Sequence, residues 1–258
     1  MLNRLLQHPL TRGLDMDAPE TTALRQRLFR EKPFLRRLYG EFHARMAAAL
    51  PAEGGRVLEL GAGGGPEPAF PDLIRSELFP VPGIAAVLDG RVLPFRAGSL
   101  RGIVMTNVLH HIPEPRRFFA EAARCVRPGG AVVMLEPWLS TWSRFVYGRL
   151  HYEPCTPGME EWRVTGDGPL TGSDEALPWV IFERDRARFE EEFPVWRVDA
   201  VTPACPFRYL LSGGVSMRSL MPGWTFGLWR GVERCLEPWM GFWAMFAYIV
   251  LRRTDSGA

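Results

Sequence analysis

"VLELGAGGGPEPAFPDLIRSEL", Val57 to Leu78, is an apolar run that passes directly into a glycine-rich loop. A short buried strand followed at once by glycines is typical of a loop that binds a nucleotide-like ligand at the start of a helix. Here Pro66, Pro68 and Pro71 stand where that helix should begin. Because proline interrupts helical hydrogen bonding, the segment predicts a ligand-binding loop that is followed by a shortened helix.

The glycine spacing of this loop differs from two common nucleotide-binding motifs. The dinucleotide fingerprint G-x-G-x-x-G needs a third glycine where this chain has Pro66 or Pro68. No G-x-x-x-x-G-K-[ST] pattern is present, so ATP binding also lacks support. On the glycines alone, a tight turn without a ligand remains an alternative. The pattern that remains is E-x-G-x-G-x-G, which consists of Glu59, Gly61, Gly63 and Gly65.

The composition of the chain is that of an ordinary globular protein. Its 258 residues are 47% hydrophobic and 23% charged, enough for one large domain or a core domain with an insertion. A net charge of +2 without a long basic run gives no reason to expect a nucleic-acid partner. The four cysteines form no C-x-x-C pair, and no apolar run reaches the roughly 20 residues of a membrane-spanning helix. We therefore expect a cytoplasmic protein without a zinc site or disulfides.

Short apolar runs alternate with helical or turn segments along most of the chain. Strands are predicted in "RVLEL", "DLIRSEL", "IAAVLDG", "RGIVMTNVLHHI", "RPGGAVVMLEPW", "VWRVDAVTP" and "AMFAYIVLRR". Strands that are continuous apolar runs argue for a mainly parallel sheet covered on both faces, which is a doubly wound α/β fold. Ligands of such sheets bind beyond the carboxyl ends of the strands, where the glycine loop lies.

Three regions lie outside this regular pattern. Residues 1–50 predict a helical cap before the main domain, 51–258. Residues 151–178 are rich in glycine, proline, threonine and aspartate, which favours a lid-like binding loop, and residues 204–241 form a tryptophan-containing insertion. Four polar residues of the lid-like loop are interpreted as ordinary solvated side chains: His151, Tyr152, Asp174 and Glu175.

An ordered series of motifs carries a family resemblance. The E-x-G-x-G-x-G pattern resembles the first motif of class I S-adenosylmethionine (SAM)-dependent methyltransferases. "LPFRAGSLRGIVMTNVLHHI" and "RCVRPGGAVVMLEP" look like later motifs of the same superfamily, particularly of its small-molecule methyltransferases, so the resemblance covers Val57 to Pro137. Two features depart from it: "SLRG" lacks the usual aspartate, and the segment from Gly65 to Asp89 is short.

The resemblance implies a seven-stranded Rossmann-like methyltransferase fold and SAM as cofactor, with S-adenosylhomocysteine as product. SAM carries no phosphate, so it depends less on a complete helix after the glycine loop. The short segment before Asp89 predicts reduced helices around the second strand and a more open adenine side. The cofactor-binding residues that follow from the resemblance and from strand-end positions are Glu59, Gly61, Ala62, Gly63, Glu77, Leu78, Asp89, Gly90, Asn107 and His110.

Methyl transfer is a direct displacement, and an oxygen nucleophile must also lose its proton to a base. His110, His111 and Glu136 lie at strand ends and are the catalytic candidates, although either histidine could instead serve packing and Glu136 could fix a turn. A metal-assisted mechanism would need clustered carboxylates at the end of the fourth strand. Thr106 and Asn107 stand there instead, so we expect a metal-independent enzyme.

The insertion gives the best clue to the acceptor. Trp229, Val232 and Leu236 share one helical stripe, which predicts core packing, an apolar substrate tunnel or an interfacial surface. We therefore expect a small apolar, lipid-like or aromatic acceptor and consider 220–245 a candidate for peripheral membrane contact. Two alternatives remain: a catalytically degenerate, cofactor-binding partner subunit, and an RNA or protein methyltransferase, which the lack of a basic tract disfavours.

Overall fold

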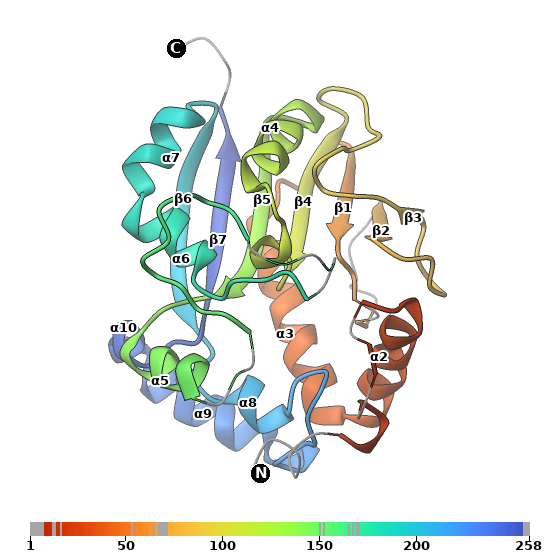
Figure 1. Cartoon of the computed structure of the whole chain (residues 1–258), viewed down its shortest axis with the longest axis vertical. Helices are drawn as coiled ribbons and strands as arrows, with labels where there is room; N and C mark the ends of the chain where they lie inside the picture. Colours follow the sequence, from red (N-terminus) through yellow and green to blue (C-terminus); the bar gives the residue numbers. More distant parts are fainter. Residues whose placement is uncertain are drawn as a thin grey trace.

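A computed structural model describes residues 8–11, 14–15, 17–52, 54–63, 65–66, 72–149, 151, 153–164, 166, 168 and 171–254. One sheet of seven strands runs through the molecule in the order β3-β2-β1-β4-β5-β7-β6 (Figure 1). β7 pairs antiparallel with both neighbours, and the other pairs are parallel. The predicted mainly parallel methyltransferase fold is therefore confirmed. The strands are β1 (Arg56–Leu60), β2 (Leu73–Glu77), β3 (Ala86–Val87), β4 (Leu100–Thr106), β5 (Val126–Pro137), β6 (Trp196–Ala204) and β7 (Phe246–Arg253).

Apolar periodicity explains how the helices cover this sheet. The α3 helix, part of the predicted helical cap, buries an apolar stripe from Leu35 to Met46, and α4 buries Phe118 and Phe119. Both helices contact β5. The helical elements are η1 (Pro9–Thr11), α2 (Pro19–Glu31), α3 (Pro33–Ala49), η2 (Leu109–His111), α4 (Pro115–Cys125), α5 (Thr141–Arg149), α6 (Leu177–Trp179), the π-helical η3 (Val180–Arg184), α7 (Arg186–Glu192), α8 (Arg208–Ser212), η4 (Gly223–Thr225), α9 (Phe226–Cys235), η5 (Glu237–Trp239) and α10 (Met240–Trp243). None of the helices in the described ranges is long and apolar enough to cross a membrane.

The connections around β2 and β3 are short. In the described parts of 61–99 the chain forms strands and turns but no helix. The prediction of reduced helices around the second strand is therefore confirmed for these residues. Of the three prolines in the loop, Pro66 is described, whereas Pro68 and Pro71 lie outside the described residues.

The helical cap and the insertion meet beyond the carboxyl end of β1. Figure 1 shows α2, α5, α8, α9 and α10 gathered at this end of the sheet. The rings of Phe34 and Phe226 join α3 to α9 at 5.1 Å, and the Lys32 ammonium donates to the Gly214 carbonyl at 2.8 Å. Through these contacts the cap and the insertion together cover the carboxyl ends of the strands. A fold of this kind is expected to bind its ligands there.

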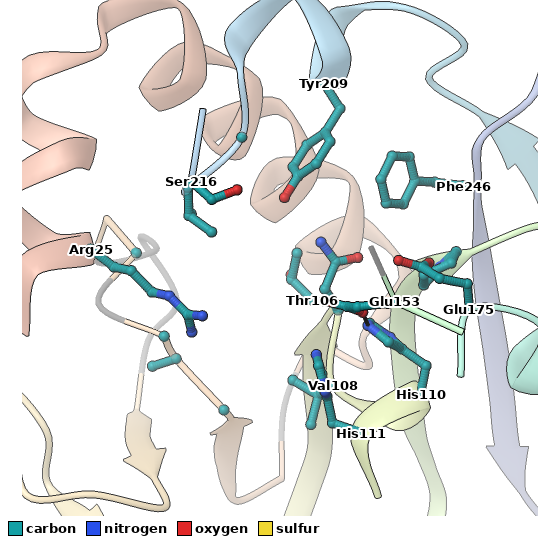
Figure 2. A pocket seen from close by; sticks show the side chains of 18 of the residues that line it. Arg25, Thr106, Val108, His110, His111, Glu153, Glu175, Tyr209, Ser216 and Phe246 are labelled. Carbon is teal, nitrogen blue, oxygen red and sulfur yellow. Dashed lines mark ion pairs between the residues drawn. The ribbon is translucent and has the colours of Figure 1, made fainter. Parts of the chain in front are cut away.

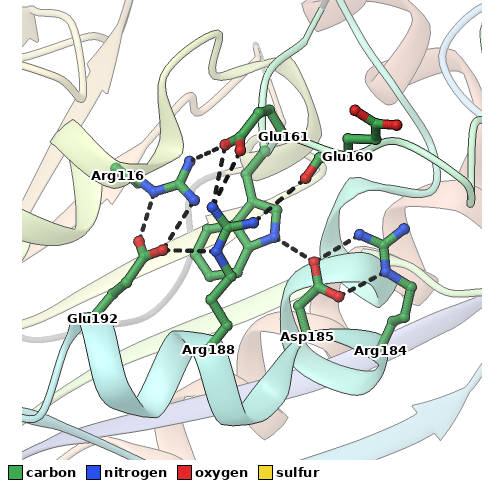
Figure 3. A network of polar contacts seen from close by, with 8 residues as sticks. Arg116, Glu160, Glu161, Arg184, Asp185, Arg188 and Glu192 are labelled. Carbon is green, nitrogen blue, oxygen red and sulfur yellow. Dashed lines mark hydrogen bonds and ion pairs between the residues drawn. The ribbon is translucent and has the colours of Figure 1, made fainter.

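The 151–178 segment is held against the body of the protein by a polar network (Figure 3). Arg116 of α4 and Arg188 of α7 each lie 3.3 Å from the Glu161 carboxylate of this segment. Both arginines also bind Glu192 of α7, at 2.6 and 2.8 Å. The indole N–H of the buried Trp162 donates to Asp185 at 2.8 Å. Exposed ion pairs contribute little individually, but together with the buried tryptophan they fix this segment to α4 and α7.

Two residues of this segment were predicted incorrectly. Asp174 and Glu175, interpreted as solvated loop residues, are each only 4% exposed. The Asp174 carboxylate accepts the N–H groups of Thr156 and Ala176, and its own N–H donates to the His110 carbonyl. These bonds pull the segment into the interior. His151 is partly exposed, and Tyr152 lies outside the described residues.

Candidate active site

A cavity of about 500 Å³ lies at the carboxyl ends of β1, β2 and β4. This volume is within the range of small-molecule sites, roughly 300 to 1,000 Å³. The glycine loop and the β2 and β3 ends line one half, and the residues after β4, the 151–175 segment and the insertion line the other half (Figure 2). All ten predicted cofactor residues line this cavity, whereas of the three predicted catalytic residues only His110 and His111 do so.

The glycine loop needs its glycines for two different reasons. Gly61 has φ +66°, and a Cβ there would lie 2.6 Å from a methyl carbon of Val108. Gly63 has φ +57°, but a Cβ there would meet nothing closer than 3.8 Å. Gly61 therefore permits close packing of the loop on the strand end, and Gly63 leaves its backbone open to the cavity.

The Glu77 carboxylate connects the loop to the end of β2. One oxygen accepts the N–H of Gly63 at 2.7 Å, and the other accepts the N–H of Leu78 at 2.8 Å. A carboxylate oxygen has two lone pairs, so each oxygen can accept one further hydrogen bond. This buried carboxylate can thus hold the loop in place and still accept from a pair of hydroxyl groups.

Glu59 is part of a second support for the loop. Its carboxylate accepts from Arg75 Nε at 2.7 Å, and Arg75 Nη2 donates to the Gly65 carbonyl at 2.9 Å. Nearby, burial and then the charge of Arg75 lower the pKa of His43 to about 4, so this imidazole is neutral at pH 7. Sequence reasoning missed Arg75, although a charged residue inside a buried strand gave a signal for it.

Asp89 and Gly90 form the outer edge of this half. The Asp89 carboxylate binds the Arg91 guanidinium through two nitrogens, at 3.0 and 2.6 Å. A Cβ on Gly90 would lie 2.8 Å from a methyl carbon of Leu60. The Asp89 side chain is partly exposed. Gly90 allows the turn to pack on β1.

Two further polar residues line the cavity, Asn107 and Arg25. Asn107 adopts φ +56°, an uncommon conformation for a residue other than glycine, and its buried Oδ1 has no hydrogen-bond partner in the described chain. Arg25 extends from α2 into the cavity (Figure 2), and among the described residues it forms no ion pair. An acceptor and a guanidinium so placed suit a ligand that carries an ammonium and a carboxylate.

His110 is held by the fully buried Glu136. One Glu136 oxygen accepts the N–H groups of Val108 and Leu109, and the other lies 2.8 Å from His110 Nδ1. Burial lowers the pKa of His110, but the hydrogen bond and charge of Glu136 outweigh it and raise the pKa to about 9. His110 is thus an imidazolium at neutral pH, and Glu136, which was predicted as a base, is a buried partner that does not reach the cavity.

His111 has the opposite protonation state. Burial and then the positive charge of His110 lower the pKa of His111 to about 3, so its ring is neutral. Its Nδ1 lies 3.2 Å from the Gly172 carbonyl oxygen, which can only accept. Nδ1 therefore carries the proton, and Nε2 retains a lone pair. Figure 2 shows this side chain directed into the cavity.

Two glutamates complete the second half of the cavity. A Glu153 oxygen lies 3.8 Å from His110 Nε2, and a Glu175 oxygen lies 3.3 Å from His151 Nδ1. Burial raises the pKa of Glu175 to about 8, with the charge of His110 opposing and that of Glu153 adding to the rise. Two groups, His110 with His111 and Glu153, and His151 with Glu153 and Glu175, place ligand atoms within 4.8 Å of one another and have donors that suit a cation.

The remaining wall is mostly apolar. Tyr209 and Ser216 of the insertion direct their hydroxyl groups into the space (Figure 2), and neither was identified from the sequence. The apolar lining residues come from the cap, α5, the insertion and β7: Phe29, Tyr39, Val146, Tyr147, Leu210, Met217, Leu220, Met245 and Phe246. This half of the cavity therefore suits a ligand with an apolar body.

The profile of a family described as "Methyltransferase domain" matches residues 31–165, more than half of the chain. The chain belongs to this methyltransferase family. It is a class I SAM-dependent methyltransferase domain, as its motifs predicted. Membership implies the use of SAM, and the glycine loop, Glu77 and the unpartnered Asn107 oxygen fit that cofactor.

Among curated proteins, this methyltransferase is similar to uncharacterized methyltransferases of mycobacteria. It is 38% identical over 65 residues to one from Mycobacterium sp. (strain JLS), covering 25% of this chain and 26% of that protein. It is 36% identical over 72 residues to one from Mycobacterium marinum, covering 28% of each. The chain thus matches only about a quarter of the length of these relatives.

Solved methyltransferase structures are similar at the level of the fold. A SAM-dependent methyltransferase from Mesorhizobium loti is 16% identical, with 81% of this chain and 96% of that chain covered and a TM-score of 0.43. The geranyl diphosphate C-methyltransferase from Streptomyces coelicolor is 11% identical, with 84% and 78% covered and a TM-score of 0.46. With such identities and TM-scores under 0.5, neither structure indicates what this chain binds or acts on.

Proposed function

We propose that this methyltransferase transfers the methyl group of SAM to a small acceptor that has an apolar body and one hydroxyl or amine group. One observation carries the proposal: a single cavity joins the glycine-loop half to a half lined by apolar side chains and buried histidines and glutamates. When bound, SAM supplies a methyl group activated by a sulfonium, so the protein needs mainly to align the acceptor and to take up its proton.

The cofactor half would hold SAM through groups of both signs. The Glu77 carboxylate would accept from the ribose hydroxyls, with Ala62, Leu78, Asp89 and Gly90 beside the nucleoside. At the other end, the Asn107 Oδ1 would accept from the ammonium of the amino acid tail, and the Arg25 guanidinium would bind its carboxylate. Gly61, Gly63 and the Glu59–Arg75 pair would keep the loop in the shape that this arrangement needs.

Glu153 is the base that this geometry favours. His110 is protonated and His111 is a weak base, because their pKa values are about 9 and about 3. The acceptor's proton would pass to the Glu153 carboxylate beside His110. His111 Nε2 would accept a hydrogen bond only from an acceptor with a second proton, such as an amine. Bound SAM would supply the methyl group, and the electrons of its carbon–sulfur bond would stay on sulfur. Glu136 acts through His110 and is a positioning residue.

The proposal needs no metal ion. A cation bound by His110 would have to displace a proton from a ring whose pKa is about 9, and it would compete with the imidazolium for the charge of Glu153. Treatment with a chelator should therefore leave the rate unchanged. If a chelator abolishes activity and added divalent metal restores it, the metal-independent mechanism is contradicted. His110, His111 and Glu153 would then be the candidate metal ligands.

Transfer of a radiolabelled methyl group from SAM tests the function directly. A panel of phenols, amines and medium-chain alcohols, matched with small polar alcohols, samples acceptors with and without an apolar body. Labelled product from the apolar members, with release of S-adenosylhomocysteine, supports the proposal. Cofactor binding without transfer to any class would instead favour a degenerate partner subunit, and transfer only to RNA or protein would contradict a small acceptor.

A further inference from the structure

Exposed apolar side chains gather at the end of the molecule where the insertion, α5 and α10 lie. Seven of the eleven large apolar side chains that are exposed in the described chain belong to α5 or to residues 220–242. Trp224 is 81% exposed, Leu228 67% and Trp239 59%. We call six of the seven the aromatic surface: Phe145, Trp224, Leu228, Val232, Trp239 and Phe242.

The α9 helix leaves part of its apolar surface in the solvent. It buries Phe226, and Trp229 packs against the core. A surface helix normally buries its whole apolar stripe, yet Leu228 and Val232 face the solvent and Glu233 is buried. The Glu233 carboxylate binds Arg208 Nε at 2.6 Å and accepts two backbone N–H groups. A satisfied acid inside and an apolar face outside indicate that this face has an apolar partner. Of the three predictions for the stripe, core packing is wrong for Val232.

Aromatic contacts make the surface continuous from α5 to α10. The Trp142 ring lies 5.9 Å from both Phe145 and Trp243, and the Trp243 ring lies 4.8 Å from Phe242. α5 and α10 pack against each other, as Figure 1 also shows. The exposed rings are therefore supported by partly buried neighbours and form a fixed patch.

The charges around this patch are mostly positive. On α5 and residues 216–243, one acid, Glu237, is exposed. The exposed cations of the same segments are Arg144, Arg149, Arg218, Arg230 and Arg234. Arg230 is also paired with Glu41 of α3, at 3.2 Å, so part of its charge is balanced. Arginines beside exposed tryptophan, phenylalanine and leucine match an anionic lipid interface, where aromatic rings insert at headgroup level and cations bind lipid phosphates.

We propose that the aromatic surface docks this protein on an anionic lipid bilayer. A symmetric dimer over the same face would bring like-charged arginines together, which disfavours a second copy as its partner. Leu220, the seventh exposed apolar residue of this end, also lines the cavity, so docking brings the cavity opening to the bilayer. An amphiphilic acceptor can then enter without crossing water, and this last step rests on the proposed function.

Vesicle flotation tests the docking without any activity. The protein should float with vesicles of phosphatidylcholine mixed with phosphatidylglycerol, less with phosphatidylcholine alone, and less again at high salt. Trp224→Ser with Leu228→Ser should abolish flotation, while Val87→Ser with Val92→Ser, an exposed apolar pair elsewhere, should not change it. Arg230→Gln with Arg234→Gln should weaken binding to the anionic vesicles about 30-fold, and Arg56→Gln at the opposite end of β1 should leave it intact.

Two outcomes would overturn the docking. One is a folded wild-type protein that floats with neither vesicle. The other is a dimer, measured by light scattering, that the Trp224→Ser, Leu228→Ser variant dissociates, because the surface would then bind a second copy. SAM binding measured by calorimetry in vesicle-free buffer separates the membrane docking from the proposed function. Absence of SAM binding would contradict the proposed function and would leave the docking unaffected.

Discussion

The two halves of the cavity are built in different ways. Apart from Arg25 of α2, the cofactor half consists of short stretches at strand ends, and its acids are bound to arginine or to backbone N–H groups. The acceptor half brings together His110, Glu153 and Glu175 from distant segments, and burial and mutual charge shift their protonation. If the proposed function holds, cofactor binding depends mainly on local backbone geometry, whereas proton transfer depends on tertiary contacts.

Replacing the proposed base, Glu153, should have the largest effect on the rate of methyl transfer. Glu153→Gln keeps the shape of the side chain but cannot take up a proton, so the rate should fall about 10² to 10³-fold. SAM affinity should stay within twofold, because Glu153 lies in the acceptor half. Rate measurements paired with calorimetry check this, with Glu160→Gln, an exposed acid of the same segment, as control. A matching loss of SAM affinity would mean that the halves are not separate.

Protonation in the acceptor half should also make folding stability depend on pH. The native pKa values of His110 and Glu175, about 9 and about 8, lie above the ordinary values of 6.5 and 4.5. Both groups therefore bind more protons in the native state, and stability should fall as pH rises from 7 to 8, on the order of 2 kcal/mol. Urea unfolding across this range measures the fall. Glu175→Gln should roughly halve the slope, and an unchanged slope would contradict the assignment.

Arg25 offers a smaller test within the cofactor half. Arg25→Gln removes a charged hydrogen bond to the carboxylate of SAM and should weaken SAM binding about tenfold. Nearby Arg27, which is exposed and paired with Glu31, provides the control Arg27→Gln. Equal effects of the two changes on calorimetric affinity would show that Arg25 does not bind the cofactor.

The smallest expected effect concerns the positioning of His110. Glu136→Gln removes the negative charge that raises the pKa of His110, so this pKa should fall from about 9 towards or below 7. The rate should fall only several-fold at low pH and more steeply as pH rises. Histidine NMR titration and a pH–rate profile give these readouts, and a His110 pKa that stays near 9 would exclude Glu136 as its cause.

The sequence was sufficient for the fold and for the location of the cofactor half. Apolar strands next to glycine are local signals, and the predicted cofactor residues from Glu59 to His110 all reach one cavity. Their individual roles in binding remain predictions. Glu136 shows what the sequence could not predict. Its position at a strand end was correct, but its burial against His110 depends on the packing of β5 between its neighbours.

The acceptor half could not be predicted from local signals. In the sequence, Glu175 is not distinguishable from an exposed loop glutamate. In the structure it is buried, because the adjacent Asp174 N–H donates to the His110 carbonyl. The orientation of α9 is a similar case, because its apolar stripe is the same whether it faces the core or the solvent. The buried Glu233–Arg208 pair and the buried Phe226 show which side faces in.

Calorimetry of SAM and S-adenosylhomocysteine on two arginine variants tests the central claim most directly. Gly63 and Gly83 both have positive φ, and a Cβ at either site has no close neighbour, so both substitutions impose similar backbone strain. Only Gly63→Arg sends a side chain into the cavity. The account predicts binding of both ligands to the wild type and to Gly83→Arg, and no heat with folded Gly63→Arg. Undiminished binding to Gly63→Arg would place the cofactor elsewhere and contradict the account.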